Sequence, residues 1–233
     1  MKSAKVVPLA PEQSVAPQLH QRLRAAIVSG DLLPGERISE TAIAATYDVS
    51  RQPVREAFIK LAEENLLVVR PQRGTFIRRI SIASALTARF IREAVEADIV
   101  RRNAQSATPT TVAALEALLE KQKKAAANNR PAEFMRLDEA FHRLLAEYAG
   151  VPDVSDYLES LNLQMNRVRN LSARQFAPDK LIQQHCNIVA AIKSGDPDAA
   201  EQALRTHLRE IQNDLPLIIA AYPDYFEDTE TAK

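Results

Sequence analysis

The sequence has few cysteines and few glycines, and it has no excess of charge of either sign. Its single cysteine, Cys186, excludes an intramolecular disulfide framework and fits a reducing cytoplasm. Five glycines among 233 residues argue against Gly-rich nucleotide loops and against a fold with many strands. No apolar run approaches the roughly 18 residues that a membrane span needs, and residues 1–13 lack the apolar core of a signal peptide. We therefore expect a largely helical cytoplasmic protein with no membrane partner.

The charges are unevenly distributed although they sum to zero. Lys and Arg together number 30, and so do Asp and Glu. Residues 1–80 contain 12 basic and 8 acidic residues, whereas residues 81–233 contain 18 basic and 22 acidic residues. A basic N-terminal third joined to an acidic remainder indicates that only the first part meets a polyanion.

Breaks at proline and glycine divide the chain into a small first domain and a helical bundle. Residues 1–14 have no periodicity, which predicts a flexible arm. Residues 15–80 combine three helical stretches with two β-prone runs around a glycine turn, which predicts three helices and a hairpin. Residues 81–223 have no strand signal and predict about six helices, and residues 224–233 form an acidic tail. The expected fold class is mainly α: an N-terminal winged helix-turn-helix domain followed by an all-α bundle.

The third predicted helix, about 51–65, has the residues that a DNA-reading helix needs. In a winged helix-turn-helix this helix enters the major groove with its N-terminus. Ser50 can cap the helix, and the exposed N–H groups of its first turn suit a phosphate. Arg51 and Arg55 lie four residues apart, so both project from one face and can bind guanine in a bidentate manner. Gln52 can read adenine or hold a phosphate. A solvated helix face is the alternative interpretation of the two arginines.

The hairpin completes the pattern, because Arg73 and Gly74 form a small basic tip that fits the minor groove or the DNA backbone. Residues 15–80 resemble the DNA-binding domain of the GntR family of bacterial transcription regulators. The matching segment reads PGERISETAIAATYDVSRQPVREAFIKLAEENLLVVRPQRGTFI, with the Arg-x-Pro-Val-Arg-Glu-Ala core and the Arg-Gly wing of that family. It departs from some relatives at Thr41, where they have an arginine. The resemblance implies an operator-binding protein.

Three of the four histidines take the place of core residues in predicted helices of the bundle. His142, His185 and His207 each lie on a stripe of apolar residues spaced three or four apart. Burying a polar group without a partner costs roughly 1–3 kcal/mol, so these side chains need partners. Asp138 lies one helical turn before His142 and can converge with it. A divalent ion bound by these four residues would give each of them a partner in the core. Zinc, nickel, manganese and iron all suit three imidazoles and one carboxylate. For each histidine alone, a satisfied core residue is the alternative.

The bundle resembles the FCD ligand-binding domain of the FadR-type branch of the same family. Its segments DEAFH, QHCNIVAAIKSGD and THL match the motifs that supply metal ligands there. Arg92 and Glu96 match an Arg-x-x-x-Glu motif in the first helix of that domain. Arg92 has apolar neighbours at helical spacing, so we expect it to point inward and pair with a carboxylate on the metal. Arg169, with Asn166 one turn earlier, is a second candidate for binding this effector, and a surface arginine is its alternative.

These features predict a bacterial transcription regulator, a repressor, with no catalytic residues. Its first domain binds double-stranded operator DNA, and its bundle binds a small organic acid at the metal. A homodimer is expected, because each DNA-binding domain contacts one half-site. One alternative is a metal-dependent enzyme built on the bundle with an accessory DNA-binding domain. Another is an architectural DNA-binding protein whose bundle only dimerises, which would leave the buried histidines unexplained.

Overall fold

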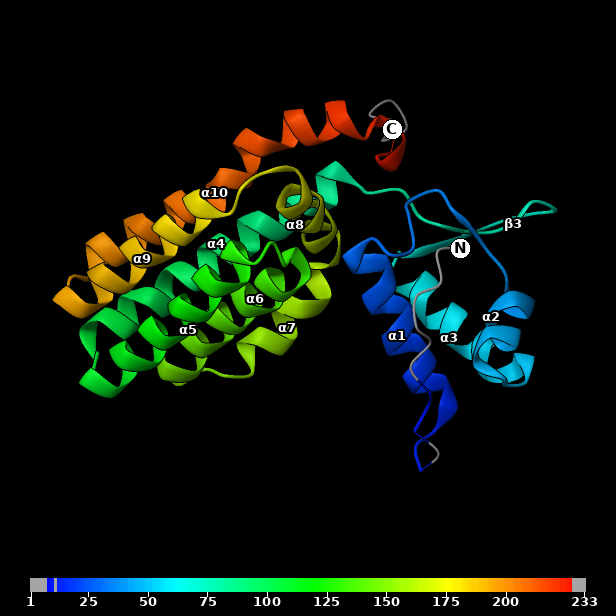
Figure 1. Ribbon diagram of the computed structural model, residues 1–233, viewed down its shortest axis with the longest axis horizontal. Helices are drawn as coiled ribbons and strands as arrows, with labels where there is room; N and C mark the ends of the chain where they lie inside the picture. Colours follow the sequence, from blue (N-terminus) through cyan, green and yellow to red (C-terminus); the bar gives the residue numbers. More distant parts are fainter. Residues whose placement is uncertain (1–7, 11, 228–233) are drawn as a thin grey trace. The chain divides into compact units, whose positions relative to one another are not determined.

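The chain consists of two units, which are seen in the computed structural model of residues 8–10 and 12–227 (Figure 1). The first unit, here termed the head, comprises the residues up to Ile80 together with those from Pro223 onward, and the bundle comprises Ser81–Tyr222. The expected arm falls largely on residues 1–7 and 11, which lie outside the described residues. Within the described ranges, no helix has both the length and the apolar character to cross a membrane.

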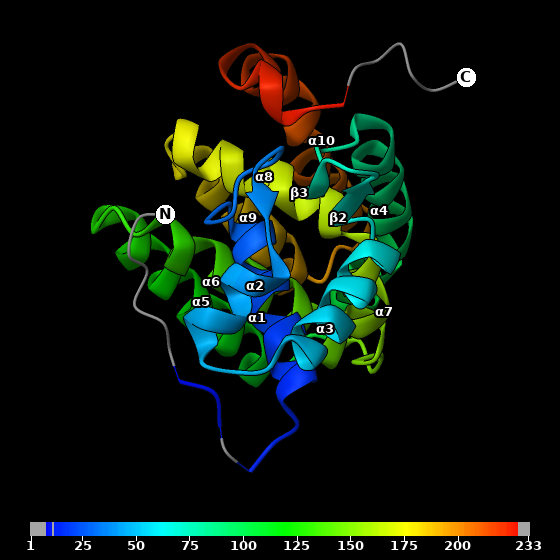
Figure 2. The same cartoon turned by 90° about the vertical axis from the view of Figure 1, so that its right-hand side faces the viewer.

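Three helices and a three-stranded sheet form the head (Figures 1 and 2). The elements are α1 (Val15–Ser29), β1 (Arg37–Ile38), α2 (Glu40–Tyr47), α3 (Arg51–Glu63), β2 (Leu67–Arg70) and β3 (Gly74–Ile77). Strand β3 pairs antiparallel with both neighbours, so the strand order is β1-β3-β2. The expected hairpin is thus confirmed and gains a third strand. Strand β1 was not predicted because its two residues are too few to show an alternation of apolar and polar side chains.

The helices of the head begin and end close to the predicted residues. Helices α1 and α3 pack together and bury the apolar stripes that helical spacing predicts. Gly30 ends α1 in the left-handed conformation at φ 78°, and the Ser39 hydroxyl accepts from the N–H of Ala42 at 3.2 Å to begin α2. The cap expected from Ser50 is wrong: this residue occupies the N-cap position of α3, but its side chain accepts no hydrogen bond from the helix. The first-turn N–H groups of α3 are therefore not capped by this hydroxyl.

Seven helices form the bundle, one more than expected. They are α4 (Ile82–Gln105), α5 (Pro109–Ala127), α6 (Pro131–Tyr148), α7 (Val154–Leu161), α8 (Leu163–Gln175), α9 (Asp179–Ser194) and α10 (Pro197–Ala221). The additional break lies at Asn162, which ends α7 and begins α8. No proline or glycine marks this break, so the sequence pattern does not show it. The core of the bundle is a continuous apolar cluster to which α4, α5, α6, α9 and α10 contribute.

After α10 the chain returns to the head. Ile80 and Phe226 form a parallel bridge, and the N–H of Ile80 donates to the carbonyl of Tyr225 at 2.8 Å. Phe226 is buried. The tail expected over residues 224–233 therefore begins with residues that pack against the head, since Phe226 offers an apolar side chain within an acidic stretch. The rest of that tail, residues 228–233, lies outside the described part of the chain.

Helices α4 and α10 are joined by a cluster of charged side chains around Glu93. This carboxylate, only 5% exposed, accepts from Arg205 at 2.9 Å and from Arg209 at 2.5 Å, and it also pairs with Arg89 of its own helix. Hydrogen bonds from Arg209, helped by those from Arg205 and Arg89, outweigh burial and lower the pKa of Glu93 to about 2. The Glu93 carboxylate is thus ionised throughout the physiological range and holds the two longest helices together.

We expect Glu93→Gln to lower the free energy of unfolding of the bundle by roughly 2–3 kcal/mol at pH 7. The pKa of this carboxyl is lower in the folded chain than its ordinary value of 4.5, so its contribution is complete above pH 4.5 and disappears as the pH falls toward 2. Urea denaturation at pH 7 and at pH 4 should therefore show a smaller difference between parent and variant at the lower pH. Glu116→Gln, which removes an exposed partner of Lys193, is the control. An equal loss at both pH values would contradict the assignment.

Candidate functional site

The N-terminal turn of α3 presents polar side chains to solvent. Arg51, Gln52 and Arg55 are all exposed, whereas Val54 between them is fully buried. The guanidinium of Arg51 lies 3.1 Å from the carboxylate of Glu40, the first residue of α2. This ion pair links the first turns of the two helices and holds Arg51 on the exposed face.

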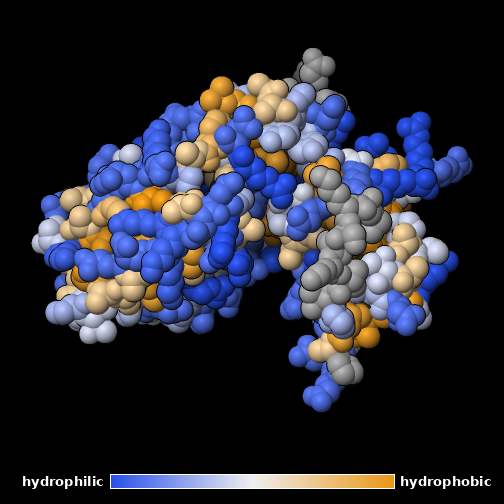
Figure 3. Space-filling view, viewed as in Figure 1, coloured by the Kyte–Doolittle hydropathy of each residue, from blue (hydrophilic) through white to orange (hydrophobic). Residues whose placement is uncertain are grey.

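The hairpin β2–β3 presents a second polar surface on the head. Arg73 is exposed in the turn and Gly74 begins β3 with φ +106°, a conformation that side chains with a Cβ rarely adopt. A Cβ at Gly74 would lie 3.0 Å from Nε of Arg37, so the guanidinium of Arg37 packs closely against this glycine. Figure 3 shows the tip of this hairpin in the blue of hydrophilic residues. The structure therefore places both expected DNA-contacting elements on the exposed surface of the head.

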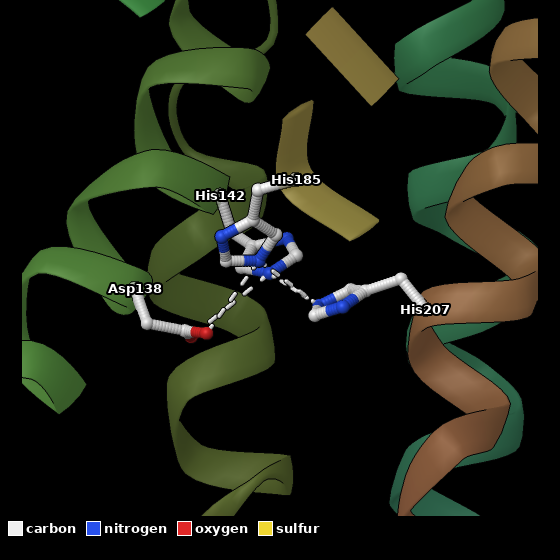
Figure 4. Close-up of side chains that lie close together, drawn as sticks. All are labelled: Asp138, His142, His185 and His207. Carbon is white, nitrogen blue, oxygen red and sulfur yellow. Dashed lines mark hydrogen bonds and ion pairs between the residues drawn. The ribbon is translucent and has the colours of Figure 1, made fainter. Parts of the chain in front are cut away.

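The three core histidines and Asp138 come together in the bundle (Figure 4). Asp138 and His142 extend from α6, His185 from α9 and His207 from α10, and all four side chains are buried. The Nε2 atom of His207 lies 3.2 Å from Nε2 of His185 and 3.3 Å from Nε2 of His142. One atom from each of the four residues lies within 4.8 Å of the corresponding atoms of the others. The residues predicted as metal ligands thus converge on one point.

The opposite nitrogen of each imidazole, Nδ1, faces an oxygen of a neighbouring side chain. The three pairs are His142 with Glu96 at 2.6 Å, His185 with Gln122 at 2.8 Å and His207 with Gln184 at 3.2 Å. An acceptor at Nδ1 favours the tautomer in which Nδ1 bears the proton and Nε2 has a lone pair. Three lone pairs then face one another without a proton between them. A cation at their centre satisfies all three, so the residues present fit a divalent metal ion.

None of these three partner residues was among the predicted site residues, although Glu96 was noted as part of the Arg-x-x-x-Glu motif. Gln122 is fully buried, and its amide also donates to the carbonyl of Leu137 at 3.1 Å. Gln184 is buried and donates to Glu210 at 3.0 Å. Gln122 follows Leu115 and Leu119 at helical spacing, so a polar residue on an apolar stripe was the signal available in the sequence.

The electrostatics of the cluster favour the protonation states that bind a metal. Burial lowers the pKa of His185 to about 3, which outweighs the opposing effect of Asp138, and burial together with the other imidazoles lowers the pKa of His207 well below its ordinary value. Both rings are thus neutral at pH 7. Burial raises the pKa of Asp138, but Arg169 and the three histidines outweigh it and hold this pKa well below its usual range. His185 and His207 therefore offer neutral imidazoles, and Asp138 offers a carboxylate, without a change of protonation.

Two arginines lie beside the cluster. Arg92 points inward as expected, with 4% exposure, and its Nε donates to Glu96 at 2.5 Å. Burial raises the pKa of Glu96, but Arg92 and His142 outweigh it and lower this pKa to about 2. Arg169 donates to Asp138 and, at 3.1 Å, to Asn166. Its side chain is only 14% exposed, so the alternative of a surface arginine is wrong.

A partly open cavity adjoins the cluster. Arg89, Arg92 and Arg169 line it together with Asp138 and His207. Asn166 is buried behind Arg169 and does not belong to this lining. Three cationic side chains in a partly enclosed space favour a small anionic ligand.

Two protein-family models match the chain. The model described as bacterial regulatory proteins, gntR family, matches residues 16–77, and the FCD domain model matches residues 88–210. The two matches fall on the head and on the bundle respectively.

Relatives and solved structures agree with these matches. The chain is 38% identical to the HTH-type transcriptional repressor RspR of Escherichia coli K12 over 94% of this chain and 97% of that protein. It is 32% identical to the HTH-type transcriptional repressor NanR of Cronobacter sakazakii over 85% of this chain and 83% of that protein. A putative GntR transcriptional regulator from Rhodococcus sp. RHA1 has a similar structure, with a TM-score of 0.72, 27% identity and coverage of 90% and 100%. E. coli McbR/YncC, at 22% identity and a TM-score of 0.73, shares the fold over 90% of this chain and 99% of its own.

Proposed function

The chain belongs to the gntR family of bacterial regulatory proteins and carries an FCD domain, and we propose that it is a repressor whose operator binding is controlled by a small carboxylate. Members of this family regulate transcription and are not enzymes, so the metalloenzyme alternative is set aside. One observation carries the proposal: the imidazole cluster and two arginines, Arg92 and Arg169, adjoin one cavity, in the same chain as a helix, α3, whose first turn exposes Arg51, Gln52 and Arg55. Two relatives named as transcriptional repressors support repression, rather than activation, as the role of the bound protein.

The head supplies the DNA-binding part of the proposal. The N-terminus of α3 enters the major groove, where Arg51 and Arg55 bind guanine edges and Gln52 an adenine edge or a phosphate. The open N–H groups that follow Ser50 face a phosphate. Arg73 and Gly74 of the wing bind the minor groove or the backbone. A head reads one half-site, so the active form is a homodimer on a palindromic operator in the bacterial cytoplasm.

The bundle supplies the sensing part. Asp138, His142, His185 and His207 would hold one divalent ion, of zinc, nickel, manganese or iron. When bound, such an ion supplies a Lewis-acidic position for one oxygen of a carboxylate. The guanidinium groups of Arg92 and Arg169 pair with the same carboxylate and orient it in the cavity.

Control of DNA binding requires that the acid bind one arrangement of the two heads better than the other. Such coupling between two sites is typically worth about 1–3 kcal/mol. The first helix of the bundle, α4, carries Arg92 and starts directly after Ile80, where the head ends. A small displacement of α4 by the ligand is therefore transmitted to the head through the chain itself.

The first test concerns DNA recognition. We expect Arg51→Ala and Arg55→Ala each to lower the affinity for an operator selected from random duplexes by about 1–3 kcal/mol, because each removes a base contact. Fluorescence anisotropy at one fixed salt concentration measures this change. Lys60→Ala, an exposed cation in the last turn of α3, is the matched control. Unchanged affinity of both arginine variants would exclude α3 as the recognition helix.

The second test concerns the metal. Protein purified without chelators should contain about one divalent ion per chain, and His185→Ala or Asp138→Ala should lose it. The thermal midpoint of the bundle should fall with the metal, because an ion that binds only the folded chain stabilises it by mass action. Elemental analysis and thermal unfolding measure the two effects. His20→Ala alters the one histidine outside the cluster and should retain the ion; absence of a stoichiometric ion from the parent would refute the site.

The third test concerns the effector. We expect Arg92→Ala to keep the metal and the operator affinity but to lose the release of DNA by the natural acid, since the guanidinium that pairs with the carboxylate is gone. Titration of the operator complex with a panel of organic acids measures the response. Arg102→Ala, an exposed arginine of the same helix paired with Asp98, is the control. If the Arg92→Ala protein responded as the parent does, Arg92 would have no part in the pocket.

A further inference from the structure

The cavity beside the imidazole cluster has a polar end that the binding of a carboxylate does not explain. Ser172 of α8 and Asp214 of α10 both line this cavity, and the Ser172 hydroxyl donates to Oδ2 of Asp214 at 3.0 Å. Ser172 is buried and Asp214 is half-buried. Because the Asp214 carboxylate repels an anion, the carboxylate of a ligand does not bind at this end of the cavity.

Helical spacing gives the distance between the two ends of the cavity. Arg169 and Ser172 lie three residues apart on one face of α8, so their Cβ atoms are about 5–6 Å apart. His207, Ile211 and Asp214 lie on one face of α10, and the seven steps from His207 to Asp214 rise about 10 Å along the helix. Asp214 therefore lies roughly 5–10 Å from the residues that would hold the carboxylate.

Apolar side chains make up much of the remaining lining. The remaining side chains that line the cavity are Met135, Met165, Leu181, Leu208 and Ile211. Such walls contact methylene groups and disfavour polar atoms in the middle of a ligand. The lining thus combines three arginines, apolar walls and, at Asp214, a carboxylate that accepts hydrogen bonds.

We propose that the acid bound in this cavity has a hydroxyl group at the end away from its carboxylate, and that Asp214 selects it by accepting the hydrogen bond of that hydroxyl. The separation of roughly 5–10 Å between Asp214 and the residues that would hold the carboxylate corresponds to a chain of about four to six carbon atoms. Asp214 repels a second carboxylate at this end. Three arginines in the lining, together with Lys180 beside Asp214, disfavour an ammonium group there. This inference rests on the proposed function of the cavity.

Matched pairs of ligands test the proposal on the full-length chain reconstituted with Zn²⁺. Calorimetry compares hexanoate with 6-hydroxyhexanoate, and pentanoate with 5-hydroxypentanoate. We expect the hydroxy acid of at least one pair to bind about tenfold or more tightly than its unsubstituted partner, as a hydrogen bond to a charged acceptor allows. In Asp214→Ala that ratio should fall to about one, with the affinity for the unsubstituted acid unchanged. Gln212→Ala, an exposed neighbour on α10, should keep the ratio of the parent.

The outcomes separate this proposal from the function on which it rests. If none of these acids binds the zinc-loaded parent, or if all bind Arg92→Ala equally well, the proposed function itself fails. If the acids bind in an Arg92-dependent manner but hydroxylated and unsubstituted acids bind equally, only the role of Asp214 fails. Tighter binding of 6-aminohexanoate than of 6-hydroxyhexanoate would also overturn the hydroxyl assignment. The ligand comparison on the parent decides the question even if Asp214→Ala does not fold, and Asp214→Ser provides a second variant.

Discussion

The arrangement of the bundle depends on the need to satisfy three imidazoles in an apolar core. Their Nδ1 atoms face side chains from α4, α5 and α9, and their Nε2 atoms converge between α6, α9 and α10. Every one of these helices is therefore positioned by a polar contact in addition to apolar packing. An unpaired polar group in such a core costs roughly 1–3 kcal/mol, so a shift of one helix relative to the others is penalised at several points simultaneously. The arrangement that lets the cluster fit a metal ion thus also constrains the packing of the bundle.

In the proposed function, each arginine beside the cluster binds a carboxylate of the chain as well as the carboxylate of the ligand, and these two partners compete for it. Arg92 is bound to Glu96 and Arg169 is bound to Asp138, so each already has a carboxylate partner within the chain. A ligand carboxylate must share these guanidinium groups or displace their partners. Binding of an acid is therefore linked to the position of α4, which carries Arg92 and Glu96, and of α8, which carries Arg169. In the proposed function, this exchange of partners connects occupancy of the cavity with the arrangement of the helices.

Local patterns in the sequence predict the elements and the ligand set, but not the contacts between distant elements. His142, His185 and His207 were found because each interrupts an apolar stripe of helical period, and Asp138 because it precedes His142 by one turn. Their partners are different: Gln122 and His185 are 63 residues apart, and no local periodicity connects them. The break at Asn162 and the two-residue strand β1 were missed because neither has a proline, a glycine or an alternation to mark it. Ser50 shows the converse, since its position at the start of α3 suggests a cap and its hydroxyl forms none.

The return of the chain to the head after α10 changes the topology of the molecule. The head is built from two separated parts of the sequence, because Phe226 pairs with Ile80 although all residues of the bundle lie between them in the sequence. The bundle is therefore an insertion into the head rather than an appendage to it, and the two units are connected by two polypeptide segments. A single cleavage after Ile80 does not release an intact head, since it leaves the residues around Phe226 attached to α10. Two cuts, or a linker that replaces Ser81–Tyr222, are needed to isolate it.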